Sequence, residues 1–81
     1  MSKSPPEEQP FRVYTPESIG QAIRHYRKQA GVTQAQLAHD LGIHPAYLSR
    51  LEKGHETEQL RRVLTILKHL GVRATLRHED W

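Results

Sequence analysis

Residues 31–54 read GVTQAQLAHDLGIHPAYLSRLEKG and decide the fold of this chain. Thr33 suits a helix N-cap, and the apolar periodicity that follows it stops at Gly42, a residue typical of left-handed helix C-caps. A second helix then starts with Pro45 in its first turn and continues through Lys53. The stretch therefore predicts two short helices joined by a tight turn at a glycine.

Two further helices flank this pair. Thr15 is a candidate N-cap for a helix over residues 16–30. Thr57 is a candidate N-cap for the last helix, whose apolar residues repeat at helical spacing up to Leu70. Each of the four stretches ends at a glycine, and these are Gly31, Gly42, Gly54 and Gly71. We therefore predict an all-α domain of four to five helices.

The period changes to two after the last helix. Val72, Ala74 and Leu76 alternate with polar residues, which is typical of a strand. A lone strand has unpaired backbone groups on both edges and needs a partner. The partner is either residues 11–15 of the same chain or the same strand of a second chain across a two-fold axis. We favour a short C-terminal strand pairing across a dimer, because symmetric pairing also buries the apolar face of each strand.

Length and composition limit the chain to one small domain. It has 81 residues and 9.4 kDa, 36% of the residues are hydrophobic, and no apolar run approaches the length of a membrane helix. The absence of cysteine excludes a disulfide framework and a thiolate metal site. We expect a flexible Pro- and Glu-rich segment over residues 1–11, a folded domain over 12–77 and a short tail over 78–81.

The charge is distributed unevenly. Of the 12 Lys and Arg residues 11 lie within residues 11–77, together with 5 of the 9 Asp and Glu residues, so this part carries a net charge of +6. Such a field attracts polyanions, and nucleic acid is the commonest polyanion in a cytosol. The alternative is an ordinary basic surface without a polyanionic partner.

The two short helices form a helix-turn-helix pattern, in which the second helix lies in the major groove of DNA. Its exposed positions should face base edges, and they are His44, Pro45, Ala46, Tyr47, Ser49 and Arg50. Arg50 is the best candidate reader, because a guanidinium can make two parallel hydrogen bonds to guanine. Gln34, Lys53 and His55 are expected to contact phosphates. The alternative is a pair of packed core helices without DNA contact.

The run GVTQAQLA at 31–38, the triplet LGI at 41–43 and the run YLSRLEKG at 47–54 resemble the Cro/C1-type helix-turn-helix of phage repressors and Xre-like regulators. The resemblance covers residues 18–71. It implies that Gln34 contacts phosphate and that His44, Pro45, Ala46 and Arg50 face base edges. It also implies a structural ion pair between Arg27 and Glu52, which joins the first and third helices. Since that family usually carries Ser, Thr or long polar side chains at 44–46, the operator cannot be taken from a relative.

The segments on either side of the four helices resemble a smaller group of proteins, the HipB-type antitoxins. The resemblance lies in VYTP at 13–16, GVRATL at 71–76 and an acidic residue before Trp81. This resemblance implies a homodimeric repressor that binds palindromic operators, regulates its own operon and forms a complex with a HipA-like serine/threonine kinase toxin. In three-component relatives a separate small protein shares the neutralising role. It also implies a bacterial cytoplasmic protein associated with the nucleoid. The alternative is a free-standing Xre-like or phage-type repressor without a toxin.

Little in the sequence indicates a metal site or a catalytic site. The six histidines show no paired metal-ligand spacing, so we expect no metal and no cofactor. None of the serines lies in a strand-turn-helix elbow, so we expect no catalytic activity. Trp81 is expected to be disordered unless it docks on a partner as an aromatic anchor.

Overall fold

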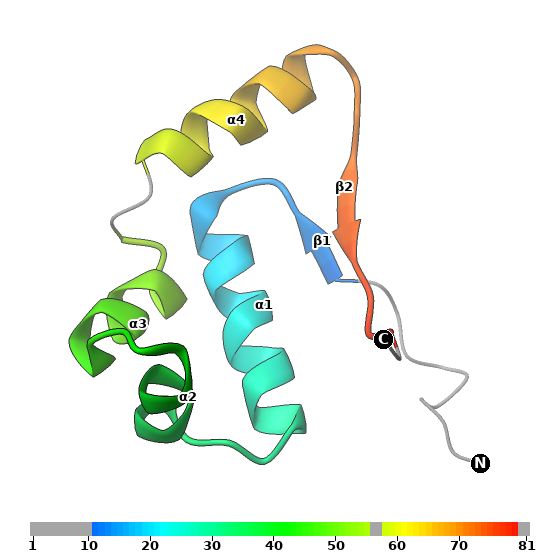
Figure 1. Ribbon diagram of the computed structural model, residues 1–81. Helices are drawn as coiled ribbons and strands as arrows, with labels where there is room; N and C mark the ends of the chain where they lie inside the picture. Colours follow the sequence, from blue (N-terminus) through cyan, green and yellow to red (C-terminus); the bar gives the residue numbers. More distant parts are fainter. Residues whose placement is uncertain (1–10, 56–57, 80–81) are drawn as a thin grey trace.

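Four helices and two short strands follow one another along the chain (Figure 1). The computed structural model describes residues 11–55 and 58–79. The elements are β1 (Phe11–Val13), α1 (Pro16–Gln29), α2 (Gln34–Leu41), α3 (Pro45–Glu52), α4 (Glu58–His69) and β2 (Ala74–Leu76). The four predicted helices and the predicted strand are confirmed, and none of the helices in this part of the chain is long and apolar enough to cross a membrane.

The ends of the domain differ in part from the prediction. Phe11, which the predicted boundary assigned to the leading segment, is the first residue of β1. The predicted cap Thr57, the leading residues 1–10 and Trp81 lie outside the described residues.

α1 begins with a closed set of hydrogen bonds. The Thr15 hydroxyl accepts from the backbone N–H of Ser18 at 3.1 Å. The Ser18 hydroxyl accepts from the N–H groups of Tyr14 and Thr15 and donates to the Thr15 carbonyl at 2.7 Å. Pro16 at the first helical position has no N–H to satisfy. The predicted cap Thr15 is therefore confirmed, and the start of α1 is fixed next to β1.

α1 approaches α3 closely at Gly20. A Cβ atom built on Gly20 would lie 2.5 Å from the carbonyl oxygens of Leu51 and Glu52, so only a glycine permits this separation. The fully or almost fully buried apolar residues of the three-helix unit include Ala22 on α1, Ala38 on α2 and Leu48 on α3. The helix-turn-helix pair is thus held on α1 by small residues and one leucine.

β2 pairs with β1 of the same chain. The strands are antiparallel, with Phe11 opposite Leu76 and Val13 opposite Ala74. The Tyr26 hydroxyl on α1 donates to the Leu76 carbonyl at 3.1 Å, and Val13 is 4% exposed. β1 of the same chain, one of the two partners that the sequence left open, therefore pairs with this strand and supplies both the backbone hydrogen bonds and a buried side chain, and pairing across a dimer stays a prediction for the opposite edge of β2. Among the described residues, the opposite edge of β2 has no strand partner.

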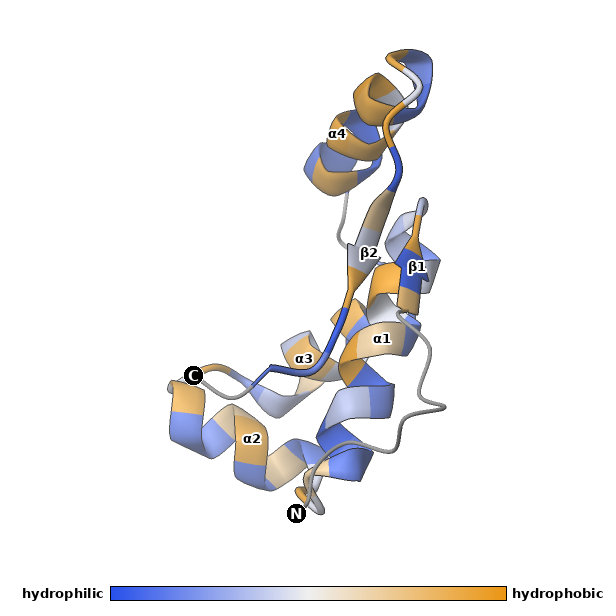
Figure 2. Cartoon of the chain, turned by 90° about the vertical axis from the view of Figure 1, so that its right-hand side faces the viewer, coloured by the Kyte–Doolittle hydropathy of each residue, from blue (hydrophilic) through white to orange (hydrophobic). Residues whose placement is uncertain are grey.

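α4 keeps much of its apolar surface exposed. It is joined to the start of α1 by an ion pair between Arg61 Nη2 and Glu17 Oε2 at 3.1 Å. Leu64 is buried, whereas Ile66 and Leu70 are 53% and 65% exposed. Figure 2 shows hydrophobic residues along α4, which stands apart from α2 and α3. This helix therefore presents an apolar face that residues 11–55 and 58–79 do not cover.

Candidate nucleic-acid interface

The turn between α2 and α3 sets the direction of α3. Gly42 has φ 69° and ψ 30°, a left-handed conformation that glycine adopts without strain. The N–H of Gly42 donates to the His39 carbonyl at 3.1 Å, and the N–H of Ile43 donates to the Ala38 carbonyl at 3.0 Å. These bonds close the end of α2 and lead directly into α3.

α3 has one buried and one exposed face. Leu48 and Glu52 point into the domain and are buried. Five of the six residues predicted to read bases are exposed, namely His44, Pro45, Ala46, Tyr47 and Arg50. The sixth, Ser49, is half-buried and lines a neighbouring hollow. The exposed side of α3 thus carries a mixed set of polar, aromatic and apolar groups, which suits base edges in the major groove.

His44 also caps α3. Its Nδ1 accepts a hydrogen bond from the N–H of Ala46 at 3.2 Å, while its carbonyl accepts from the N–H groups of Tyr47 and Leu48. A ring nitrogen that accepts carries no proton, so in this arrangement Nε2 is the donor. His44 therefore fixes the start of α3 and presents one N–H outward.

A basic hollow lies beside α3. It is lined from α2 and α3 by Gln34, Ser49 and Lys53, and from α1 by Arg24 and Lys28. The first backbone N–H groups of α2 add partial positive charge at this end of the helix. The arrangement suits a phosphate of the DNA backbone, which would position the domain without reading sequence.

An ion pair between Arg27 and Glu52 lies next to the hollow. Arg27 Nε is 2.7 Å from Glu52 Oε2, and Arg27 Nη2 is 3.2 Å from Oε1. Arg27 Nη1 donates in addition to the Val32 carbonyl at 2.8 Å. The side chains of Arg27 and Glu52 are 9% and 3% exposed, so the ion pair is shielded from solvent. It joins α1, α3 and the loop that leads into α2.

Gln34 is fixed by the same carboxylate. Its Nε2 donates to Glu52 Oε1 at 2.9 Å. Burial acts to raise the pKa of Glu52, but the hydrogen bonds from Arg27 and Gln34 and the charge of Arg27 outweigh burial and lower this pKa. Glu52 is thus held as a carboxylate, and it positions the amide of Gln34 at the hollow.

A family model described as a helix-turn-helix domain matches residues 18–79. That range contains both helices, the turn at Gly42 and the exposed face of α3. The chain belongs to the helix-turn-helix domain family. It is therefore a DNA-binding regulator of this helix-turn-helix type.

Relatives of this helix-turn-helix protein carry two kinds of name. An uncharacterized HTH-type transcriptional regulator, y4mF of Sinorhizobium fredii, is 37% identical over 60 residues, which are 74% of this chain and 79% of the relative. Antitoxin HipB of Escherichia coli O6:H1 and of Escherichia coli K12 is 32% identical over 65 residues, which are 80% of this chain and 69% and 74% of the two relatives. No solved structure gives a significant match to the chain.

Two residues that line the basic hollow were not predicted from the sequence. Arg24 and Lys28 line the hollow, but they are not among the residues that the sequence predicted to contact phosphate. Their spacing of four residues puts them on one side of α1, and this is the signal that could have found them. His55, predicted to contact phosphate, is exposed just after α3 and is not among the residues that line the hollow.

Proposed function

We propose that this protein represses transcription by binding, as a dimer, to palindromic operators near its own gene. The observation that carries the proposal is the exposed face of α3 beside a hollow lined by Arg24, Lys28 and Lys53. A phosphate in the hollow would fix the domain on the duplex, and the side chains of α3 would read base edges. In a dimer, the two copies of α3 would meet half-sites about one helical turn apart.

Arg50 is the residue that we assign to base reading. Arg50→Ala should weaken binding to DNA upstream of the gene by roughly 5- to 150-fold, or about 1 to 3 kcal/mol, and should affect random DNA far less. Arg62→Ala is the matched control, because it removes an exposed arginine of α4 that lies outside the interface. An equal loss on operator and on random DNA would show that Arg50 does not read sequence.

We further propose that two copies associate through β2 and the neighbouring face of α4. Among the described residues one edge of β2 is unpaired. The apolar residues exposed nearby are Val63, Ile66, Leu70 and Val72. Of the residues predicted for the dimer strand, Ala74 and Leu76 lie in β2, and Val72 lies in the turn before it. Sedimentation should show a dimer, and Ile66→Asp should dissociate it by placing a charge in the apolar face.

The protein is also proposed to act as an antitoxin. This role is supported by the two relatives named antitoxin HipB, which align with 80% of the chain. The toxin would be a HipA-like serine/threonine kinase, with a third small component sharing the complex as in some systems, in the bacterial cytoplasm at the nucleoid. A tagged copy purified from its native host at low salt should bring down a stoichiometric kinase-like protein. Recovery of the dimer and DNA alone would contradict the antitoxin role.

A free-standing regulator is the second candidate. It is favoured by the identity of 37% to a relative named only as a transcriptional regulator. The neighbouring reading frame separates the two candidates, since a kinase-like gene directly beside this one supports the antitoxin and an isolated gene supports the regulator.

A further inference from the structure

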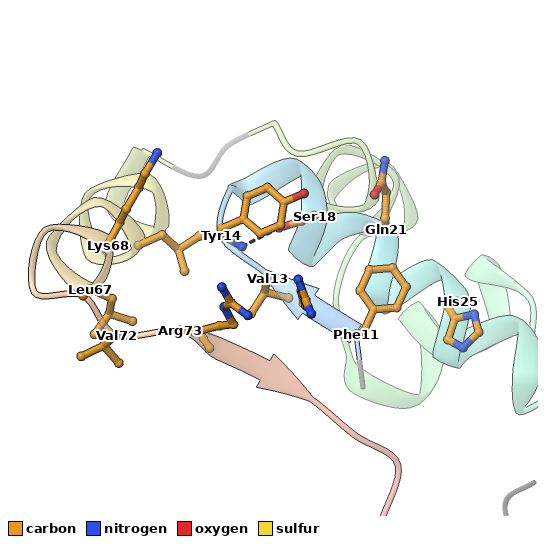
Figure 3. A pocket seen from close by; sticks show the side chains of 14 residues that line it. Phe11, Val13, Tyr14, Ser18, Gln21, His25, Leu67, Lys68, Val72 and Arg73 are labelled. Atoms are coloured by element: carbon orange, nitrogen blue, oxygen red, sulfur yellow. Dashed lines mark hydrogen bonds between the residues drawn. The ribbon is translucent and has the colours of Figure 1, made fainter. Parts of the chain in front are cut away.

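A groove lies between the strand pair and α4, and it shares no residue with the basic hollow beside α3. Its volume is about 880 Å³, within the range of pockets that enclose drug-sized molecules. Val13, Leu67 and Val72 contribute apolar surface, and Arg12, Lys68 and Arg73 contribute positive charge. Figure 3 shows Leu67, Lys68, Val72 and Arg73 on one side of the groove and Phe11 and His25 on the other.

The charge of this groove specifies what it can hold. None of the 14 residues that line it is Asp or Glu. A ligand that fits must therefore combine an apolar body with negative charge. Residues 79–81 of the chain read Glu-Asp-Trp, which places two carboxylates next to the largest apolar side chain. The groove and this segment are complementary in charge and in polarity.

We infer that residues 79–81 of one copy dock in this groove of a second copy. The inference rests on the proposed dimer. When a strand pairs with its own copy about a two-fold axis normal to the sheet, the pairing is antiparallel, so the residues after Leu76 of one chain run beside those before Ala74 of the other. Residues 71–74 line the groove. Residues 77–81 span up to about 17 Å when extended, which is long enough for them to run beside the residues before Ala74 of the second copy.

The groove of the same chain is less accessible to this segment. The chain enters β2 from α4 and leaves it at Leu76, opposite Phe11 at one end of the groove, and it then runs away from α4, which carries Leu67 and Lys68 (Figure 1). Glu79 does have a neighbour within its own chain, since its Oε2 lies 3.6 Å from Arg77 Nη2. Both side chains are largely exposed, and such a pair contributes little in water, so it does not compete with docking in the second copy.

Tryptophan fluorescence tests the inference directly, because Trp81 is the single tryptophan of the sequence. As the protein concentration passes through the dimerisation range measured by sedimentation, the emission maximum should shift to shorter wavelength. Lys68→Glu combined with Arg73→Glu should abolish this shift and raise the dimer dissociation constant roughly tenfold or more. Arg62→Glu makes the same charge change as Lys68→Glu alone but lies outside the groove, and it should leave both unchanged.

Mixing two variants identifies the groove that is used. One chain keeps Trp81 and carries Lys68→Glu and Arg73→Glu, and the other keeps the groove and carries Trp81→Phe. Docking in the second copy predicts that the shift, absent from the first variant alone, returns in the mixture. No recovery, or a shift that does not depend on concentration, would overturn the inference.

The remaining outcomes are also decisive. A shift seen only when a co-purified partner is present would assign the segment to that partner and overturn docking in the second copy. Operator binding measured by anisotropy on the same samples keeps the two proposals separate. A dimer that binds operator without any shift refutes only the docking, whereas a protein that neither dimerises nor binds operator refutes the proposed function as well.

Discussion

Replacing Gly20 by alanine tests the closest approach between the helices of the domain. The new Cβ atom would lie 2.5 Å from the carbonyl oxygens of Leu51 and Glu52, whereas ordinary contacts begin near 3.4 Å. α1 and α3 must therefore separate by about 0.9 Å to accept it. Since both obstructing atoms belong to the backbone, no side-chain rotation can relieve the overlap.

The sign of this change follows from two opposing terms. Overpacking of a well-packed core costs about 1 to 3 kcal/mol, and the backbone overlap at Gly20 favours the upper part of that range. Alanine has a better helix propensity than glycine, which offsets about 1 kcal/mol. We therefore expect Gly20→Ala to lower the free energy of unfolding by about 1 to 2 kcal/mol. For a domain of this size, that lowers the melting temperature by about 4 to 16 °C.

Thermal and urea unfolding followed by circular dichroism measure this loss. The exposed neighbour Gln21 supplies the control, because comparing Gln21→Gly with Gln21→Ala measures the propensity term without overlap. If Gly20→Ala were as stable as the wild type, or gained what the Gln21 pair gains, the close approach of α1 to α3 would be refuted.

Three other substitutions test the ion pair and the phosphate contacts. Arg27→Ala should lower the melting temperature, because Glu52 would stay buried without its arginine; an unchanged melt would contradict a structural role. The pKa of Glu52 is lowered in the folded protein, so its contribution to stability is present above its ordinary pKa of 4.5 and is lost as the pH falls through the folded-state value. The difference in urea stability between wild type and Glu52→Gln should therefore shrink below pH 4.5, and a constant difference would disprove the linkage. Lys53→Ala should weaken operator and random DNA alike and reduce the slope of log affinity against log salt by about 0.9; an unchanged slope would remove Lys53 from the phosphate contacts.

The helix-turn-helix was predictable because its signals are local in sequence. The Thr33 hydroxyl accepts from the N–H of Gln36 three residues later, and Gly42 adopts the left-handed conformation that ends α2. Thr15 and Ser18 close the start of α1 in the same way. Each of these contacts spans at most four residues, so residue types and spacing suffice to find it.

The strand partner and the hollow were not predictable by the same reasoning. β1 has three residues, and the sequence offered residues 11–15 only as one of two possible partners of the strand that contains Leu76, without a feature that decides between them. The sequence also gave no reason to bring Arg24 together with Lys53, or to tie the Gln34 amide to Glu52. These contacts depend on how α1 packs against α2 and α3, which is a property of the tertiary structure.

The pairing of β1 with β2 has a consequence for the order of folding during synthesis. Residues 11–13 leave the ribosome early, and their partners at 74–76 leave it more than 60 residues later. The helices depend mainly on short-range contacts and can assemble sooner, since contacts close in sequence form faster than distant ones. A nascent chain would therefore carry a formed recognition helix while β1 is still unpaired. Any association through β2 can begin only after residues 74–76 of each copy have been made.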